Sequence, residues 1–400
     1  MTRQIDTDVI IIGGGIAGLW LLRTLSLKGY KAVLLENNVL GGEQTSKSQG
    51  IIHGGTKYTL SGTLTGAAQC IAGMPDRWRK ALAGEGEIDL TQATVLSPYH
   101  YLWSPGGLGS RLTSFFASKA LRGRVVPLKP EQFPAIFRQK DFNGKVYQLN
   151  ELVLNIPSVV KTLVSSLENR CIKVDWQKDT RLLAENGQIQ HIAVEQGGST
   201  LRLTAKRFVT TAGEGTAALM KLWGISHPEM QLRPLHMPMV KHRHPDPVFA
   251  HCIGTKPEPR LTITSHPANN GETVWYLGGK IAEEGVNQSE ADLIASAKKE
   301  LSALFPWVSF EQAQWGTLKV NRAEPKQGGL SRPDSAFCQG VGNGIVTWPT
   351  KLALAPDLSD EVVKLLNDGG ISPSGNDDFT LPATVSRPSF APPFWSECFD

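Results

Sequence analysis

Apolar runs and turn residues alternate over residues 1–40 in the pattern of a complete βαβ unit. An apolar run at 8–12 is typical of a buried parallel strand, and glycines follow it directly. Leucines then recur at helical spacing up to Gly29, and a second apolar run at 31–35 ends at Glu36. The pattern therefore predicts a strand, a helix and a second strand in succession.

The glycines after the first strand have the spacing of a dinucleotide-binding turn. Gly13 allows the tight turn, Gly15 lets a pyrophosphate approach the backbone, and Gly18 lets the helix pack closely against the strand. The N-terminus of that helix stabilises phosphate charge. The Glu36 carboxylate offers two oxygens to the two ribose hydroxyls and repels a 2′-phosphate, which disfavours NADP. The unit predicts a bound dinucleotide but does not distinguish FAD from NAD.

The rest of the chain predicts a second, sheet-based domain. Residues 226–324 contain strands broken by prolines and one amphipathic helix that Ser289 caps. Residues 91–149 contain a helical run at 108–121, and both segments together favour a sheet with helices on its outer side. The proline-rich, aromatic tail at 370–400 is expected to pack back on the body or on a partner subunit. Three aromatic residues either line a pocket or pack in the core: Tyr99, Tyr101 and Trp103.

Composition narrows the class of protein. A chain of 400 residues is more than one core usually fills, which favours two domains. The formal net charge is only +4, so nucleic acid is not an expected partner. The five cysteines include no Cys-x-x-Cys pair for zinc or disulfide exchange. The apolar run from Val9 to Leu22 is too short for a membrane span and lacks the basic flank of a signal peptide, so we expect a cytoplasmic protein, with peripheral membrane contact left open.

Residues 44–58 (QTSKSQGIIHGGTKY) are polar, then apolar, then rich in glycine. This segment resembles the flavin-contacting stretch of the D-amino-acid oxidase and glycine oxidase family, and more closely its glycerol-3-phosphate dehydrogenase and L-2-hydroxyglutarate oxidase branches. Three later segments resemble the same family in the same order. They are a returning strand at 208–213 that closes over the FAD diphosphate, a substrate-domain strand and helix from 275 to 305, and a C-terminal flavin-binding turn and helix at 342–352.

The resemblance implies an FAD-dependent oxidoreductase with the glutathione-reductase-2-type FAD fold. The fold class is then α/β, with a Rossmann-like FAD-binding domain and an α+β substrate domain built on a sheet. The FAD domain of the family is discontinuous, and here it would combine residues 1–90, 150–225 and 325–400. Residues 91–149 and 226–324 would form the substrate domain.

Hydroxyl side chains and glycines in these segments suit contact with FAD. Hydroxyls form hydrogen bonds, and glycines let the backbone approach a flat ligand. An ordinary surface turn is the alternative for the segment at 44–58. The nucleotide unit and the resembling segments together predict these FAD-contacting residues: Gly13, Gly15, Ile16, Ala17, Gly18, Glu36, Asn37, Thr45, Ser46, Ser48, Gln49, Gly50, Ile52, His53, Ala212, Gly213, Gly344, Ile345, Thr350 and Lys351.

A helix is expected just after residue 347. Thr347 can cap it, and Pro349 suits its early turn. Its electropositive start, with the charge of Lys351, would stabilise the negative charge that develops near flavin N1 on reduction. A plain packing helix is the alternative. Pro356 should kink or interrupt this helix.

Four side chains are candidates for the substrate side of the site. The resembling branches place a His-Gly pair against the flavin, and His53 could contact FAD, carry it covalently, or take a proton from an alcohol as a base. Arg322 lies near the carboxylate-binding arginine of the family, although extra residues precede it and the usual Arg-Pro step is missing. Arg332 is the rival candidate, and Lys280 is expected to line the site.

Histidines also cluster between residues 236 and 251. Two of them, His242 and His244, would share one face of a strand. No carboxylate or cysteine joins the cluster at a familiar ligand spacing, so neutral or partly solvated histidines are expected and no metal site.

The expected function follows from the expected cofactor. No second βαβ glycine fingerprint occurs downstream, so the organic substrate should be the reductant rather than NAD(P)H. We expect FAD to take a hydride from a C–N or C–O centre of a small, anionic substrate (an amine, an amino acid or a 2-hydroxy acid) and to pass electrons to oxygen or a quinone. The alternatives are a protein that binds FAD for structure or partner recognition without turnover, and an NAD-dependent dehydrogenase. The sequence does not choose the substrate, the electron acceptor or the oligomeric state.

Overall fold

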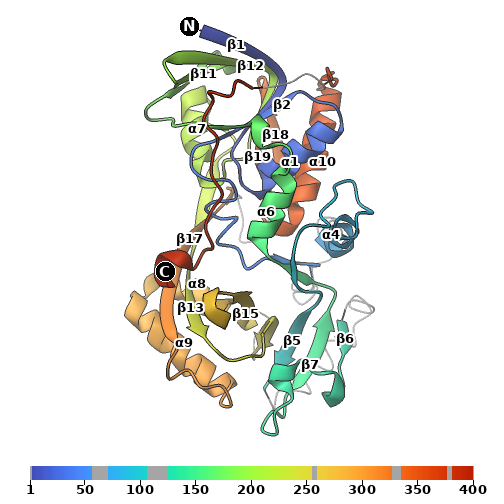
Figure 1. Ribbon diagram of the computed structural model, residues 1–400, viewed down its shortest axis with the longest axis vertical. Coiled ribbons are helices and arrows are strands. Elements are labelled where there is room, and N and C mark those ends of the chain that lie inside the picture. Colours follow the sequence, from blue (N-terminus) through green and yellow to red (C-terminus); the bar gives the residue numbers. More distant parts are fainter. Residues whose placement is uncertain are drawn as a thin grey trace.

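The computed structural model describes residues 2–55, 71–105, 125–254, 259–326, 335–375 and 381–399. The molecule is elongated, with one sheet and its helices at one end and a second sheet at the other (Figure 1). Some expectations lie outside the described residues, namely the helix at 108–121, Arg332 and the end of the flavin segment from Thr56 on.

The first sheet contains the predicted βαβ unit. Its strands run in the order β10 (Thr180–Glu185), β11 (Gln188–Gln196), β12 (Ser199–Thr210), β1 (Thr2–Ile12), β2 (Ala32–Glu36) and β9 (Cys171–Lys173), while β19 (Gly344–Trp348) pairs with β12 and with β18 (Phe337–Val341). Strand β12 returns parallel to β1, as the segment at 208–213 predicts. Strand β1 is longer than the predicted strand because residues 2–7 also pair with β12.

Helices cover both faces of this sheet. One face carries α1 (Ile16–Leu27), α6 (Ile156–Val164) and α10 (Ala355–Asp368), and the other carries α7 (Thr216–Trp223). Val9 and Ile11 belong to the first hydrophobic cluster, whereas Ile10 and Ile12 belong to the second. The buried part of β1 is a continuous apolar run because both sets of side chains are covered.

The second sheet forms the other end of the molecule (Figure 1). Its order is β17 (Gln314–Pro325), β13 (Met230–His242), β16 (Thr273–Gly278), β15 (Pro259–Pro267), β14 (Ala250–Ile253), β5 (His100–Ser104), β7 (Lys145–Leu149) and β6 (Val125–Pro127). Helix α9 (Glu290–Leu304) packs on it, and the Ser289 hydroxyl accepts a hydrogen bond from the Asp292 amide, which confirms the predicted cap. Trp103 is buried in the same cluster as Trp275 and therefore packs in the core.

Smaller elements connect the two sheets. A short sheet consists of β3 (Ile51–Ile52), β8 (Leu152–Leu154) and β4 (Val95–Ser97), and the remaining helices described are α4 (Met74–Leu82), α8 (Lys280–Glu284) and α11 (Ser396–Phe399). The α/β fold class, with a Rossmann-like part and a second sheet, is confirmed. The exact division of the chain into two domains stays a prediction.

The helix expected directly after residue 347 begins later in the structure. Thr347 lies inside β19, where its hydroxyl donates to the Thr210 carbonyl at 2.7 Å, so it cannot cap a helix. A 3₁₀ turn at 352–354 precedes α10, which begins at Ala355. Pro356 lies in the first turn of α10, where its missing N–H is not needed, and the predicted interruption is wrong.

The C-terminal segment 381–399 runs from the first sheet to the second along the outside of the molecule (Figure 1). Phe394 and Trp395 are buried against the second sheet, with the Phe394 ring 4.2 Å from the ring of Tyr276 and the Trp395 ring 5.8 Å from that of His266. The expectation that the tail packs back on the body is confirmed for these residues.

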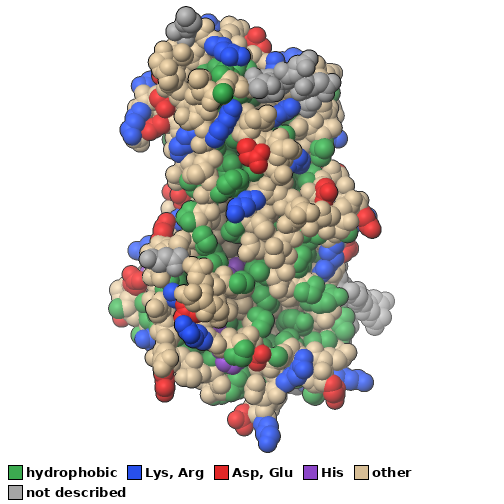
Figure 2. All heavy atoms as spheres, viewed as in Figure 1, with side chains coloured by type: hydrophobic (Ala, Val, Ile, Leu, Met, Phe, Trp, Pro, Cys, Tyr) green, Lys and Arg blue, Asp and Glu red, His purple; other side chains and the backbone are tan. Residues whose placement is uncertain are grey.

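The surface shows no strong charge bias on the face in view. Lys and Arg side chains are interspersed with Asp and Glu in Figure 2, in agreement with the small net charge. Within the described parts of the chain, no helix is long and apolar enough to cross a membrane.

Candidate functional site

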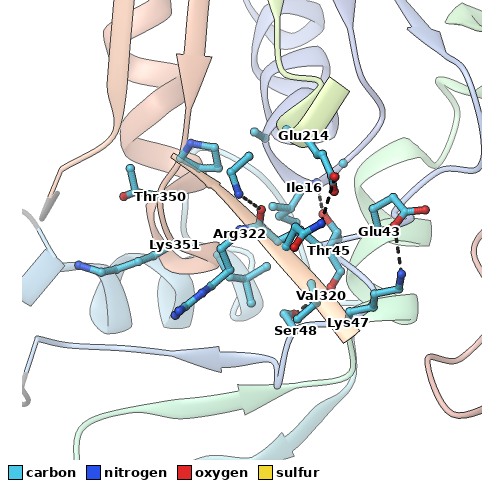
Figure 3. Close-up of a pocket in the computed structure, with 18 of the residues that line it drawn as sticks. Ile16, Glu43, Thr45, Lys47, Ser48, Glu214, Val320, Arg322, Thr350 and Lys351 are labelled. Atoms are coloured by element: carbon cyan, nitrogen blue, oxygen red, sulfur yellow. Dashed lines mark hydrogen bonds and ion pairs between the residues drawn. The ribbon is translucent and has the colours of Figure 1, made fainter. Parts of the chain in front are cut away.

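A cavity of about 520 Å³ lies where the first sheet meets the second (Figure 3). Its walls come from the turn after β1, the segment after β2, the end of β12, and the paired strands β13 and β17. The predicted site residues that line it are Gly13, Gly15, Ile16, Ala17, Glu36, Thr45, Ser48, Gln49, Gly50, His53, Ala212, Gly213, Arg322, Thr350 and Lys351. Most of the predicted flavin segment therefore borders one continuous space.

The glycine turn has the shape that a dinucleotide requires. Gly13 has φ +119°, and a Cβ at Gly18 would lie 1.9 Å from the Gly13 carbonyl oxygen, so neither position accepts a side chain. A Cβ at Gly15 would meet only the Thr45 hydroxyl, at 3.0 Å, and would otherwise project into the cavity. The backbone is thus bare where a pyrophosphate would approach it.

Two threonines hold this turn in place. The Ile16 amide at the start of α1 donates to Thr45 Oγ1 at 3.0 Å (Figure 3). The Thr211 hydroxyl donates to the Gly13 carbonyl at 2.8 Å, which ties the end of β12 to the turn. Ala212 and Gly213 follow at the cavity wall, as predicted.

Glu36 stands at the end of β2 with its carboxylate facing the turn. One oxygen accepts from the Gly14 amide at 2.6 Å and the other from the Asn38 amide at 2.5 Å. Burial raises the pKa of Glu36, and these backbone hydrogen bonds oppose that rise. Each oxygen keeps a second lone pair for a ribose hydroxyl. The cradle therefore fits the dinucleotide part of FAD.

The opposite wall of the cavity contains two arginines. Arg233 on β13 and Arg322 on β17 are cross-strand partners, and both line the cavity. Arg233 Nη1 lies 3.5 Å from Glu324 Oε1, and Arg322 Nε donates to the Arg233 carbonyl at 3.4 Å. The two guanidinium groups are directly opposed, Glu324 offsets the charge of Arg233, and an anion in the cavity would add a partner for the pair. Lys351 borders the same cavity (Figure 3).

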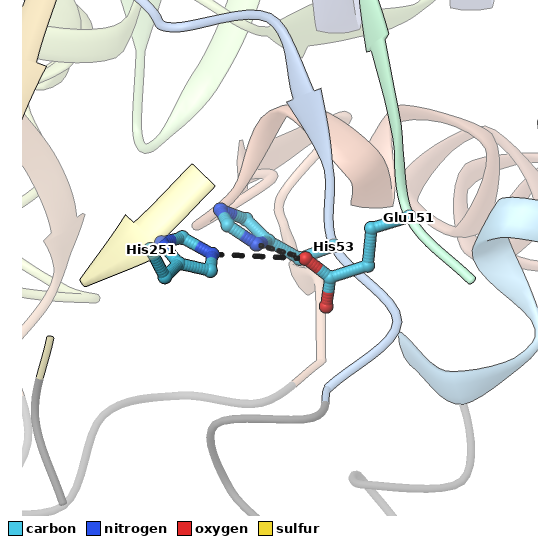
Figure 4. Close-up of side chains that lie close together, drawn as sticks. All are labelled: His53, Glu151 and His251. Carbon is cyan, nitrogen blue, oxygen red and sulfur yellow. Dashed lines mark hydrogen bonds and ion pairs between the residues drawn. The ribbon is translucent and has the colours of Figure 1, made fainter. Parts of the chain in front are cut away.

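A buried carboxylate lies beside His53 (Figure 4). Glu151 Oε2 is 3.2 Å from His53 Nδ1 and 3.9 Å from His251 Nε2, and Oε1 accepts from the Gly54 amide at 3.1 Å. Burial opposes ionisation of Glu151, but hydrogen bonds from His251 and His53 overcome it and hold its pKa well below the usual range. Glu151 is therefore a buried anion next to the cavity.

Some predicted site residues do not line the cavity. Lys280 points elsewhere and pairs with Glu284 at 2.9 Å. Gly344 and Ile345 begin β19, where Ile345 is part of the core and Gly344 packs on Trp223. The others outside the cavity lining are Gly18, Asn37, Ser46 and Ile52.

Three important residues were missed by the sequence analysis: Glu151, Arg233 and His251. His251 belongs to the histidine cluster, but the carboxylate that approaches it is far away in sequence. The fold brings them together because Glu151 directly precedes β8 while His251 lies on β14. The other clustered histidines have different partners; His242 is buried, which lowers its pKa to about 4. β13 ends at His242, so the prediction that His242 and His244 share a strand face is wrong.

A glycine-turn cradle at a helix N-terminus and an acidic residue for the ribose define a dinucleotide-binding protein, and the cavity walled by a second sheet adds space for a substrate. A family model described as "FAD dependent oxidoreductase" matches residues 8–349, and the chain belongs to that family. FAD is accordingly its cofactor.

The chain also resembles individual proteins over its whole length. It is 48% identical over 400 residues to a "Probable FAD-dependent oxidoreductase" of Pseudomonas aeruginosa, covering 100% of both chains. The crystal structure of that protein has a TM-score of 0.86 at 43% identity over 100% of both chains. Glycine oxidase from Geobacillus kaustophilus has a TM-score of 0.63 at 15% identity, covering 95% of this chain and 100% of that one, and shows the shared fold. L-α-glycerophosphate oxidase from Mycoplasma pneumoniae, solved with FAD bound, has a TM-score of 0.60 at 14% identity, covering 91% and 95%.

Proposed function

We propose that this oxidoreductase oxidises a carbon bearing a hydroxyl or amine in a small anionic substrate and passes the electrons to oxygen or a quinone. One observation carries the proposal. The arginine pair of β13 and β17 and the histidine at residue 53 line the same cavity as the dinucleotide cradle. An anion-binding group and a proton acceptor are thus available beside the site where the cofactor binds.

Each residue has a distinct role in this proposal. FAD, when bound, supplies the acceptor for the hydride. Arg322 and Arg233 hold the substrate anion, because a guanidinium can hold a carboxylate or phosphate through two parallel hydrogen bonds. His53 accepts the proton of the substrate hydroxyl or ammonium group. Leu235 and Val320, also cross-strand partners in the lining, limit the space for water beside the substrate.

The names of two neighbours support the substrate class. Glycine oxidase and L-α-glycerophosphate oxidase share this fold and are named for small substrates with an anionic group, one an amine and the other an alcohol derivative. Both centres remain in the proposal because the same arginine wall would bind either anion.

The test is the visible spectrum of the purified protein under anaerobic conditions. A panel of 2-hydroxy acids, glycerol phosphate, amino acids and N-methyl amines is added one by one, and bleaching of the flavin band identifies the substrate class. Air or a soluble quinone is then admitted, and the faster return of colour identifies the acceptor. A flavin that none of these anions bleaches, yet that photoreduces normally, would contradict the proposal and favour binding without turnover.

The arginine role has its own variants. Arg322→Met and Arg233→Met should raise the substrate concentration needed for half-maximal bleaching, while Lys280→Met, which alters a cation outside the cavity lining, serves as the matched control. Equal effects of all three substitutions would show that general charge, rather than the arginine wall, attracts the substrate.

A further inference from the structure

We propose that Glu151 is a positioning residue that holds the proton of neutral His53 on Nδ1, so that Nε2 presents its lone pair to the cavity. The inference rests on the proposed role of His53 as proton acceptor and adds the residue that prepares it. Glu151 itself need not touch the substrate.

Glu151 clamps both the side chain and the backbone at this point. Its Oε2 lies 3.2 Å from His53 Nδ1, and its Oε1 accepts from the amide of Gly54, the next residue, at 3.1 Å. Two contacts to adjacent residues fix the orientation of the ring relative to the chain. Figure 4 shows the ring of His53 with one nitrogen toward the carboxylate and the other directed away from it.

The tautomer follows from the chemistry of the carboxylate. An ionised carboxylate only accepts hydrogen bonds, so the nitrogen facing it must be the donor. In a neutral imidazole the other nitrogen then has a lone pair. A base on this ring therefore acts through Nε2, and the wrong tautomer would present an N–H to the substrate proton instead.

His251 approaches the same oxygen of this carboxylate. Its Nε2 lies 3.9 Å from Glu151 Oε2, and its Nδ1 is 2.8 Å from the Thr262 hydroxyl. The ring of His100, on β5, lies edge-on at 4.3 Å from that of His251, and both histidines are buried. The carboxylate thus has donors on His53 and Gly54 and a third, more distant ring nitrogen on His251, which offset the cost of burying its charge.

Exposure distinguishes the roles within this group. The His53 side chain is 29% exposed, whereas those of Glu151 and His251 are each 2% exposed. A proton that arrives from the cavity therefore meets His53 first. Glu151 also borders the cavity but is nearly covered, and its contact with Nδ1 is the route by which it acts on the His53 ring.

A metal ion is the competing explanation for these three residues. Their potential ligand atoms all lie within 4.8 Å of one another. A metal held about 2.1 Å from both Nδ1 and Oε2 would also leave these atoms roughly 3.0–3.4 Å apart, so the separation of 3.2 Å fits a hydrogen bond and a shared metal equally. The two arrangements differ in whether Nδ1 carries a proton, which the measurement below determines.

The decisive measurement is nitrogen NMR of FAD-loaded protein labelled with ¹⁵N in histidine, with the His53 signals assigned from their loss in His53→Asn. Wild-type protein should show the neutral His53 ring protonated on Nδ1. Glu151→Gln replaces the charged acceptor by a neutral amide with one acceptor oxygen, and the ratio of Nδ1–H to Nε2–H forms should fall about tenfold, the equivalent of one hydrogen bond to a charged group. Asp8→Asn, which alters a buried carboxylate outside the cavity lining, should leave the ratio unchanged.

Other results would overturn the proposal. A wild-type ring protonated on Nε2, or a ratio that Glu151→Gln leaves unchanged, would do so. One equivalent of bound metal in the wild type, absent from Glu151→Gln, would also overturn it in favour of a metal site. If Glu151→Gln does not retain FAD, Glu151→Asp decides by the same measurement, because the shorter side chain lengthens the contact with Nδ1 and should lower the ratio.

A kinetic measurement separates positioning from packing. With the first panel compound that bleaches the flavin, Glu151→Gln should lower kcat about 100-fold, within the range of general-base catalysis, and leave KM nearly unchanged. An unchanged kcat would contradict the positioning role. If no compound bleaches the flavin, the proposed function fails, while the NMR measurement still decides the tautomer.

Discussion

Two glycines of the nucleotide turn, Gly15 and Gly18, are predicted to respond in opposite ways to the same substitution. In Gly18→Ala the new Cβ would lie 1.9 Å from the Gly13 carbonyl oxygen and 2.7 Å from the Thr211 hydroxyl, so the backbone of α1 or β1 must shift. Overpacking of this kind costs about 1–3 kcal/mol, and more where backbone is involved. In Gly15→Ala the new Cβ would meet only the Thr45 hydroxyl, at 3.0 Å, and the folded apoprotein should lose less than about 1 kcal/mol.

The effects on FAD binding should follow the opposite order, with the larger loss in Gly15→Ala. The methyl group added at Gly15 occupies the space in which a pyrophosphate approaches the backbone amides at the start of α1. Loss of one charge-assisted hydrogen bond, worth about 1.5–3 kcal/mol, weakens FAD binding about 10- to 150-fold. Gly18→Ala should weaken FAD binding only as far as it disturbs the fold.

The assay separates the two quantities. Urea unfolding of the apoprotein reports stability, and quenching of flavin fluorescence on titration of FAD reports affinity. Gly340→Ala is the control, because a Cβ there would meet no atom within 4 Å. If Gly15→Ala bound FAD as tightly as the wild type, or if Gly18→Ala unfolded at the wild-type urea concentration, the assignment of ligand contact to one glycine and of packing to the other would be refuted.

Three further predictions concern the substrate wall, acid stability and the tail. Arg322→Met and Arg233→Met should each raise KM for an anionic substrate about 10- to 100-fold, from the loss of a charge-assisted contact, and an unchanged KM in stopped-flow reduction would exclude the arginine wall as the anion site. Burial lowers the pKa of His266 to about 3, below its unfolded value near 6.5, so the unfolded state binds the extra proton. The free energy of unfolding should therefore decline as the pH falls from 6.5 toward 3. Urea titrations should show a shallower decline in His266→Gln, and an equal slope would contradict this prediction. Trp395→Ala should lower the free energy of unfolding by about 3–5 kcal/mol, because the buried Trp395 ring packs the tail against the second sheet. A loss below about 1 kcal/mol would show that the tail contributes little to the stability of the second sheet.

The parts of the fold predicted correctly from sequence depend on short-range patterns. The βαβ unit follows from apolar runs and from glycines with individual steric reasons, and each of those reasons reappears in the structure at Gly13 and Gly18. The cap at Ser289 was predictable because an N-cap and its helix are adjacent in sequence.

The predicted helix cap at Thr347 is wrong because this position depends on long-range pairing rather than on a short-range pattern. A threonine two residues before a proline is also compatible with the end of a strand, and the hydrogen bond from Thr347 to Thr210 joins segments that are far apart in sequence. A proline at 356 fits either an interruption or a first turn, and the pattern alone does not locate the start of α10 at Ala355. Tertiary pairing of β19 with β12 and β18 places Thr347 in a strand.

The cofactor side of the site depends mainly on short-range sequence patterns, and the substrate side depends on long-range pairing of strands. The predicted FAD contacts lie largely at backbone turns. Such turns require glycines, which are visible in the sequence itself. The substrate wall and the carboxylate behind His53 instead depend on which strands become neighbours. Arg233 meets Arg322 only because β13 pairs with β17, and Glu151 meets His251 only after the small sheet joins the second one. A bound dinucleotide was therefore predictable from the first forty residues and FAD from the resembling segments, whereas the chemistry beside the cofactor required the two sheets to be placed together.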